Sequence, residues 1–185
     1  MALREILTEP NKLLREKSLA VEKVDEDLQK LMNDMLETMY AAPGIGLAAI
    51  QIGAPKRVIV LDIGWRYESE STNDEKQVVR KNPIYFVNPE IITKSANNST
   101  YEEGCLSVPG QFAEIERPDK CHIKYLDYYG QSKELVVKDM LATCIQHEMD
   151  HLEGILFIDY LSKLKKSMIV KKLTKQKGQL DRIVI

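Results

Sequence analysis

Two histidines that flank a glutamate are the residues of this chain best suited to chemistry, in the run His147-Glu148-Met149-Asp150-His151. Side chains four residues apart lie on one face of an α-helix, so both imidazoles can bind one metal ion. Glu148 follows the first histidine and can accept a proton from a metal-bound water. The largely apolar segment 140–145 precedes the motif, so we expect a buried helix. The pattern indicates a metal-dependent hydrolase.

A catalytic site of this kind needs a third protein ligand and a position left open for water. Some zinc peptidases take that ligand from a histidine six residues after the second one, and others take it from a glutamate on a later helix. The first position is Phe157 in this chain, and no glutamate follows Glu153. We therefore expect the third ligand upstream of the motif.

Four upstream residues could complete the site, namely Cys105, Cys121, His122 and Cys144. Cys144 would have to span a helical rise of about 10 Å to the second histidine, so we interpret it as a small buried apolar side chain. Cys121 and His122 begin a strand-like stretch without a surrounding motif, and both are interpreted as structural. Cys105 lies in the tight, Gly- and Pro-bounded segment 102–110, and a thiolate there would close a Cys/His/His site.

Three segments of the chain resemble the sequence motifs of peptide deformylases, and they follow one another in the same order. Residues 44–51 read GIGLAAIQ and resemble GxGLAAxQ, residues 103–107 read EGCLS, and residues 146–151 read QHEMDH and resemble QHExDH. The likeness extends across most of the chain. It implies an α+β fold in which antiparallel β-sheets surround a central helix bearing the HExxH motif, with a C-terminal helix.

The resemblance implies a reaction and a metal. The reaction is removal of the N-formyl group from the N-terminal formyl-methionine of newly synthesised peptides, with release of formate. Cys105, His147 and His151 are implied as ligands of Fe²⁺, which Zn²⁺, Ni²⁺ or Co²⁺ can replace, and Glu148 as the base that activates water. A Cys/His₂ set suits zinc equally well by its chemistry, so the choice of iron rests on the resemblance alone.

The resemblance also implies residues that stabilise the reaction and hold the peptide. The Leu106 backbone N–H and the Gln51 amide are implied as donors to the oxyanion. Ile45, Gly46 and Gly104 are implied as substrate-binding positions. The glycine after Ile45 lets the substrate backbone approach closely and pair like an added strand.

The chain departs from common bacterial members in two places outside the motifs. The polar segment 66–82, which we expect to be an exposed loop, is longer than the corresponding connection, and Phe112 stands where such members often have arginine. The preference for peptide residues beyond the first therefore does not follow from the resemblance. Glu103 has two interpretations, as an ordinary surface acid or as a residue that holds its loop.

Two alternative functions share part of this evidence. A metallopeptidase would use the same HExxH chemistry and differs in the third ligand and in the Gly-rich segment. A closed structural metal site would hold four protein ligands and no water. Its ligands would be Cys105, His122, His147 and His151, which leaves Glu148 without a role.

The composition indicates one globular catalytic domain, residues 1–185, of which 44% are apolar and 29% charged. A net charge of −2 excludes a polycation that binds DNA. The segment 162–185 is nevertheless basic, with eight lysines and arginines against one acid. It is either a docked amphipathic helix with a solvated lysine face or a contact with ribosomal RNA.

We expect a cytoplasmic location. Three cysteines, an odd and small number, favour a reducing compartment over a disulfide framework. The first ten residues do not resemble a secretory signal. No run of eighteen apolar residues exists, so we expect no membrane span.

The elements that must position these residues can be read from periodicity and turn residues. Apolar side chains at three- and four-residue steps predict a helix over 25–40, and we interpret that stripe as core rather than a ligand groove. A second helix is expected over 138–152, ending near Gly154, and a third from near Tyr160, with Leu161, Leu164, Met168 and Ile169 on one side. Strands are expected at 57–63, 84–87, 91–93, 122–127 and 134–137, the last two forming a hairpin about the turn at 128–131.

Overall fold

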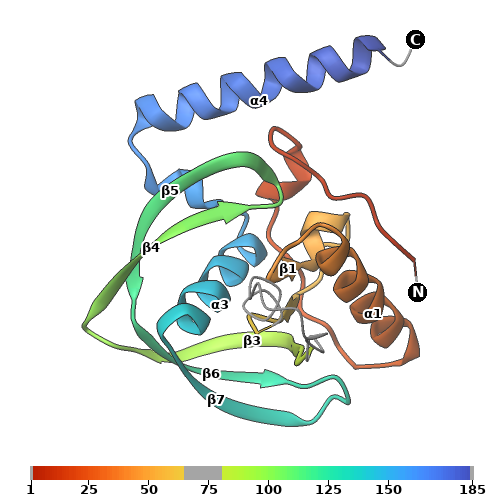
Figure 1. The fold of residues 1–185 in the computed structure, drawn as a ribbon. Helices are drawn as coiled ribbons and strands as arrows, with labels where there is room; N and C mark the ends of the chain where they lie inside the picture. The colour runs from red at the N-terminus through yellow and green to blue at the C-terminus, as the bar shows by residue number, and fades with distance from the viewer. Residues whose placement is uncertain (1, 65–80, 184–185) are drawn as a thin grey trace, which may run out of the picture.

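The computed structural model describes residues 2–64 and 81–183. Helix α3 (Asp139–Leu152), which carries the HExxH motif, lies between a five-stranded antiparallel sheet and a two-stranded hairpin (Figure 1). This arrangement confirms the α+β architecture expected from the sequence. Most of the segment predicted as an exposed loop, 66–82, lies outside the described residues.

The five-stranded sheet has the order β1-β2-β3-β6-β7, and all neighbouring strands in it are antiparallel. Its strands are β1 (Gly46–Ala48), β2 (Val58–Leu61), β3 (Ile84–Lys94), β6 (Lys120–Leu126) and β7 (Ser132–Lys138). The last two form the predicted hairpin, closed by a turn in which Gly130 N–H donates to the Asp127 carbonyl at 3.0 Å. The strands predicted at 84–87 and 91–93 are one strand, β3.

Strand β2 is buried on both faces of the sheet, which explains its uninterrupted apolar sequence. Alternate side chains of a strand point to opposite faces. Ile59 and Leu61 join the core cluster that includes α3, whereas Val58 and Val60 join the cluster beneath helix α1 (Glu26–Ala41). The sheet therefore separates α3 from α1.

Asp25, the first residue of the predicted helix, caps α1, since its side chain accepts a hydrogen bond from the Leu28 N–H at 3.1 Å. The Met/Leu stripe of α1 packs into the core. The fully or almost fully buried members are Leu28, Met32, Met35 and Met39. The interpretation of this stripe as core is confirmed.

The hairpin of β4 (Asn98–Cys105) and β5 (Val108–Pro118) was missed in the sequence analysis. Most of its side chains are polar or exposed, so its sequence contains no run of apolar residues that would predict a strand. A register shift after Gly104 places Cys105 opposite Val108, across a tight turn. This turn points the thiol of Cys105 toward α3.

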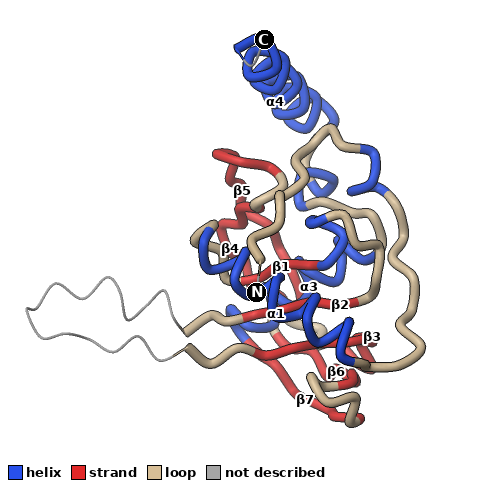
Figure 2. The backbone as a smooth tube through the Cα atoms, turned by 90° about the vertical axis from the view of Figure 1, so that its right-hand side faces the viewer, coloured by secondary structure: helices blue, strands red, loops and turns tan. Residues whose placement is uncertain are grey.

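The C-terminal helix α4 (Lys163–Ile183) begins after a short 3₁₀ turn, η3 (Phe157–Tyr160), and projects from one end of the molecule (Figures 1 and 2). The predicted start near Tyr160 is three residues early. The residues predicted to share one side of this helix are divided in the structure, because Leu164 and Met168 are 73% and 63% exposed whereas Ile169 is buried together with Leu173. Met168 lies about 100° around the helix from Ile169 and therefore faces away from the core.

Three short turns also bear on the position of the site. They are the 3₁₀ turns η1 (Lys12–Arg15) and η2 (Ala49–Ile52), and the turn after α3 at Gly154, whose φ is 73°. Among the described helices, none combines the length and apolar character needed to cross a membrane.

Candidate active site

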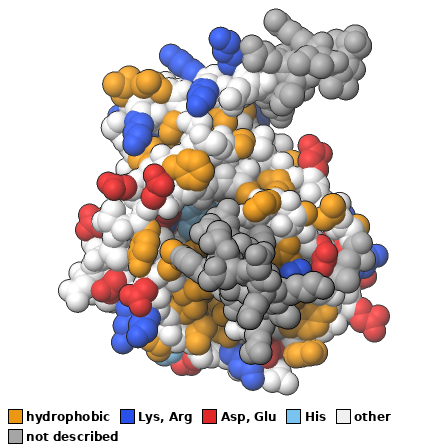
Figure 3. Space-filling model, viewed as in Figure 1, with side chains coloured by type: hydrophobic (Ala, Val, Ile, Leu, Met, Phe, Trp, Pro, Cys, Tyr) orange, Lys and Arg blue, Asp and Glu red, His pale blue; other side chains and the backbone are white. Residues whose placement is uncertain are grey.

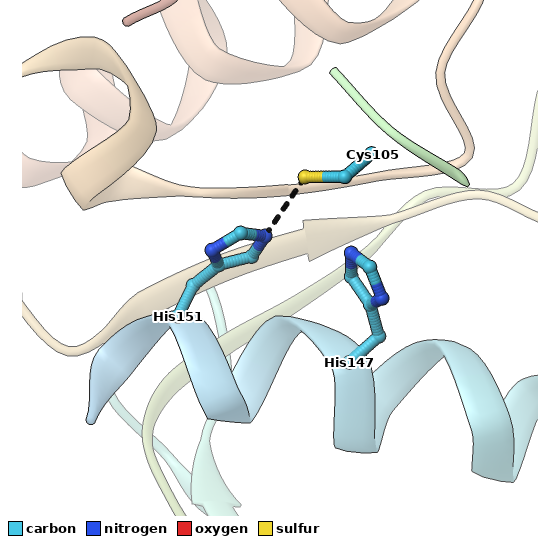
Figure 4. A group of neighbouring side chains, drawn as sticks. All are labelled: Cys105, His147 and His151. Carbon is cyan, nitrogen blue, oxygen red and sulfur yellow. Dashed lines mark hydrogen bonds between the residues drawn. The ribbon is translucent and has the colours of Figure 1, made fainter. Parts of the chain in front are cut away.

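A thiol and two imidazoles converge at the centre of the molecule. Cys105 lies at the end of β4, while His147 and His151 lie one turn apart on α3 (Figure 4). One ligand atom from each residue lies within 4.8 Å of the others, and Cys105 Sγ is 3.3 Å from His151 Nε2. Among the described residues, this is the one such group of three that could hold a metal ion.

The donor set fits a divalent transition metal. Both histidines are buried, at 8% exposure for His147 and 1% for His151. Burial, and then the neighbouring His147 and Arg117, lower the pKa of His151 well below its usual value, so its imidazole is held in the neutral form that binds metals. Three protein ligands leave a further coordination position for water or substrate.

The other candidate ligands lie elsewhere. His122 is on β6, where its Nε2 lies 2.9 Å from a Glu134 carboxylate oxygen, so the closed four-ligand site lacks its fourth member. Cys121 is buried in the core beneath the sheet. Cys144 packs against the same core, and burial raises the pKa of its thiol to about 12. Phe157 stacks on the ring of His147, with centroids 6.2 Å apart.

A buried carboxylate orients the first histidine. Glu103 Oε2 lies 2.8 Å from His147 Nδ1, and Arg117 donates to both oxygens of this carboxylate at 2.5 and 3.0 Å. Arg117 also donates to Asp150 at 2.8 Å. Burial alone would raise the pKa of Glu103, but the hydrogen bonds from His147 and Arg117 outweigh it and the pKa lies below its usual value. Glu103 is therefore a buried positioning residue and not a surface acid.

Arg117 and Asp150 were not singled out from the sequence. The sequence did contain one signal for Arg117, namely that it continues the alternation of Ala113 and Ile115 along β5. The structure buries all three residues. An arginine at the end of an apolar alternation indicates a buried charge that needs partners. Its partners, however, are distant in sequence and follow only from the fold.

The Glu148 carboxylate occupies space that is free only because residue 46 is a glycine. A Cβ atom at Gly46 would collide with the Glu148 carboxylate and with the side chain of Leu61. The carboxylate is buried, and its Oε2 atom has no hydrogen-bond partner. Burial raises the pKa of Glu148 to about 7, with the nearby imidazole of His147 acting in the opposite direction. The geometry gives Gly46 a role that the sequence analysis did not foresee, namely room for this carboxylate.

The Gln51 side chain is fixed with its NH₂ group toward the thiol. Its Oε1 accepts a hydrogen bond from the Ala48 N–H at 2.8 Å, and its Nε2 lies 3.6 Å from Cys105 Sγ and 3.1 Å from Ser107 Oγ. The N-terminal segment 7–9 connects the segment that carries Gln51 to the turn that carries Ser107. Its backbone N–H groups donate to the carbonyls of Gln51 and Ser107 at 2.7 and 2.8 Å.

Gln51, Cys105, His147 and Glu148 border one cavity of about 530 Å³. Figure 3 shows a histidine surface exposed on this face of the molecule, beside apolar and acidic side chains. Beside the ligand candidates Cys105 and His147, the cavity lining includes six other residues expected at the site, namely Ile45, Gly46, Gln51, Gly104, Leu106 and Glu148. Phe112 also borders it, with its ring so close to Gly104 that an added Cβ there would lie 2.5 Å from the ring.

Comparison with known proteins decides the family. A family model described as polypeptide deformylase matches residues 3–167. The chain belongs to this family. Among curated peptide deformylases, that of Pelagibacter ubique is 62% identical over 185 residues and 100% of both chains, and that of Maricaulis maris is 56% identical over 182 residues and 98% of both. The crystal structure of peptide deformylase from Ehrlichia chaffeensis matches with a TM-score of 0.86 and 39% identity, covering 96% of this chain and 98% of that one.

Membership of the peptide deformylase family confirms the enzyme class predicted from the sequence. The chain is a hydrolase that removes the formyl group from N-formyl-methionyl peptides, with a Cys/His/His group that can bind its metal. The metallopeptidase alternative is wrong. The likeness to the Ehrlichia chaffeensis enzyme extends to its crystal structure in complex with actinonin, at a TM-score of 0.84 and 40% identity over 95% of this chain and 98% of that one.

Proposed function

We propose that the formyl group of the substrate binds beside Cys105, His147 and His151, and that Glu148 performs the proton transfers of its hydrolysis. The observation that carries this proposal is the buried, unpartnered Oε2 of Glu148, in a residue that borders the same cavity as Cys105 and His147. A carboxylate held there without a protein partner is available to a water molecule. In this proposal, residues 1–185 form a single catalytic domain.

Fe²⁺ is the physiological ion in this proposal, and Zn²⁺, Ni²⁺ or Co²⁺ can replace it. Iron is supported by the likeness of the three motifs to those of peptide deformylases, and the donor set accepts all four ions. A bound divalent ion lowers the pKa of a coordinated water and polarises the formyl oxygen. Cys105, His147 and His151 would hold it, with Glu103 orienting His147 through the bond at 2.8 Å.

Glu148 accepts a proton as water attacks the formyl carbon, and it returns that proton to the amine as the C–N bond breaks. The products are formate and a free peptide amino terminus. Negative charge develops on the formyl oxygen during the attack, and the Gln51 Nε2 group and the Leu106 N–H donate to it. The Gln51 amide is suited to this role because the Ala48 N–H holds its Oε1 and so fixes its orientation.

The peptide backbone is held by Ile45, Gly46 and Gly104 in this proposal. Strand β1, which begins at Gly46, is an edge strand of the five-stranded sheet. Strand β4, which contains Gly104, pairs within the described structure only with β5. Both strands border the cavity and have an edge that can accept an extended peptide as an added strand.

Glu148→Gln tests the role of the base. The assay is anaerobic formate release from formyl-Met-Ala-Ser, with metal analysis of the same sample. We expect the variant to keep its metal and to lose about 10²- to 10⁴-fold in kcat, while the exposed-acid control Glu22→Gln keeps both. Full activity of Glu148→Gln would rule out this role, and absence of formate from the unsubstituted enzyme with every one of the four ions would contradict the function itself.

We also propose that the enzyme acts in the cytoplasm and contacts the ribosome through α4. All three cysteines are free, as expected in a reducing compartment. Basic side chains gather over α4 in Figure 3, and Lys165, Lys171, Lys172 and Lys175 are exposed. Changing these four lysines to glutamine should weaken ribosome binding and reduce its salt dependence. Unchanged affinity and salt dependence would exclude the RNA contact, leaving a solvated lysine face.

A further inference from the structure

Tyr160, the last residue of η3, makes two contacts with residues near the metal-ligand candidates. Its hydroxyl donates a hydrogen bond to Oδ2 of Asp150 at 2.9 Å, and the same oxygen accepts one from Nη1 of Arg117 at 2.8 Å. The Arg117 guanidinium also lies over the Tyr160 ring, with 4.9 Å between its central carbon and the ring centroid. A cation at this distance from the face of a tyrosine ring is attracted to it. Tyr160 therefore holds Arg117 both directly and through Asp150.

Arg117 in turn connects Tyr160 to His147 by way of Glu103. The Nε and Nη2 atoms of Arg117 donate to the two oxygens of the Glu103 carboxylate, and Oε2 of that carboxylate lies 2.8 Å from Nδ1 of His147. The side chains of Arg117 and Glu103 are only 4% and 5% exposed, so little water is present to replace a lost hydrogen bond. A displacement of the guanidinium therefore displaces the carboxylate, and with it the imidazole that the carboxylate orients.

These contacts lie away from the cavity that contains the metal-ligand candidates. Arg117, Asp150 and Tyr160 border a second cavity, of about 330 Å³, and none of the three lines the first one. Tyr160 is thus placed to act on the site without touching the substrate. Its ring covers one side of the guanidinium against this second cavity, where water would compete for the hydrogen bonds of Arg117.

The backbone of η3 is held in place by contacts that do not involve Arg117. The carboxylate of Asp159, next to Tyr160, accepts a hydrogen bond from the Leu156 N–H at 2.8 Å. It also pairs with Arg15 at 2.6 Å and with Lys166 of α4 at 2.5 Å. Tyr160 is therefore fixed independently of the residue that it contacts, as a residue that positions another must be.

We propose that Tyr160 is a positioning residue of the metal site. It fixes Arg117, and Arg117 together with Glu103 orients His147. This inference rests on the proposed function, because it takes His147 to be a metal ligand. The consequence is that a half-exposed tyrosine outside the active-site cavity increases the affinity for the metal ion and fixes the geometry of its coordination.

Tyr160→Phe tests this role, because phenylalanine keeps the ring and removes only the hydroxyl. The dissociation constant of Co²⁺ is measured by competition with a chelator, and the visible absorption of the bound ion reports its coordination geometry. We expect the dissociation constant to increase about two- to tenfold, as for the loss of one hydrogen bond, and the absorption spectrum to change. KM for formyl-Met-Ala-Ser should stay the same, because Tyr160 does not line the active-site cavity. Tyr160→Leu, which also removes the ring, should weaken Co²⁺ binding further.

A double-mutant cycle with Glu103→Gln shows whether Tyr160 acts through Glu103. Residues in one hydrogen-bond network have coupled effects, whereas independent residues have additive ones. Once Glu103 no longer holds Arg117 and His147 by its charge, the additional change Tyr160→Phe should alter the dissociation constant of Co²⁺ by less than twofold.

Tyr129→Phe is the matched control, since it makes the same substitution at a tyrosine that is 74% exposed, in the turn between β6 and β7. It should leave both the dissociation constant and the spectrum unchanged. The melting temperature of each metal-free variant separates a general loss of stability from an effect on the site.

An unchanged dissociation constant and spectrum in Tyr160→Phe, with or without a lowered melting temperature, would overturn the inference. Equal effects of Tyr160→Phe in the presence and absence of Glu103→Gln would also overturn it, because Tyr160 would then act by another route. Binding of Co²⁺ by the unsubstituted enzyme without formate release with any of the four ions would contradict the proposed function, while the dissociation constants would still decide the role of Tyr160. Absence of Co²⁺ binding would overturn both.

Discussion

His147 Nδ1 lies 2.8 Å from Oε2 of Glu103, so a metal-ligand candidate on α3 is oriented by a carboxylate on β4, forty-four residues earlier in the chain. The same carboxylate receives two hydrogen bonds from Arg117 and is buried. A carboxylate that accepts from the ligating histidine fixes the direction of its ring and increases its basicity. The hairpin β4–β5 therefore supplies both a ligand candidate, Cys105, and the support for another.

Glu103→Gln should lower the affinity of the enzyme for its metal by about 10–100-fold. The glutamine has nearly the same shape but lacks the charge that holds His147 and Arg117. The affinity is measured by competition with a chelator, on protein shown by circular dichroism to be folded. The control Glu114→Gln changes an exposed acid of the same hairpin. Equal affinities of the two variants would show that Glu103 does not support the ligand.

Gly46→Ala should lower kcat by about 10²-fold, the order expected from a displacement of about 1 Å at a catalytic group. The added Cβ would collide with the Glu148 carboxylate, which must then move. The metal content should be retained, because Glu148 is not among the ligand candidates. Gly64→Ala is the matched control, since a Cβ there approaches only Asp62 Oδ1, at 3.8 Å. A kcat within twofold of the control would contradict this account.

Gln51→Leu should lower kcat by about 10²- to 10³-fold, the usual loss for one oxyanion donor. Leucine fills a similar volume and cannot donate a hydrogen bond. Ser107→Ala removes a partner of the Gln51 Nε2 group but leaves the Ala48 bond that orients the amide, so its effect should be much smaller. Steady-state kinetics on metal-loaded samples separates the two variants, and a larger loss in Ser107→Ala would reverse the assigned roles.

Asp159 should stabilise the fold at neutral pH and lose this effect in acid. Burial alone would raise its pKa, but the Leu156 N–H and the cations Lys166 and Arg15 hold the pKa below its ordinary value of 3.8. Since the folded-state pKa is the lower one, the charged form favours the fold above the unfolded pKa, and the advantage disappears as pH falls through the folded pKa.

Asp159→Asn should therefore lower the melting temperature at pH 7 by a few degrees, corresponding to about 1–3 kcal/mol. The difference from the unsubstituted protein should narrow as the pH falls below about 4. Calorimetry over a pH series measures this difference. A gap that stays constant down to pH 2 would show that the ionised carboxylate is not the source of the stability.

The sequence determined the elements whose signals are local. The steps of three and four residues along α1, the cap at Asp25 and the hairpin of β6 and β7 all arise within a few neighbouring residues. The HExxH spacing is local too, because one helical turn separates His147 from His151. Cys105 was predicted as the third metal ligand by elimination, since the chain offers no ligand of the usual kinds after the HExxH motif.

Only the tertiary structure decided which distant side chains support these residues. Glu103 meets His147 and Arg117, and Gly46 meets Glu148, because the hairpin and the edge of the sheet pack against opposite sides of α3. Local periodicity reports which face of an element is buried, whereas the identity of the group across that face depends on how elements far apart in the chain pack together.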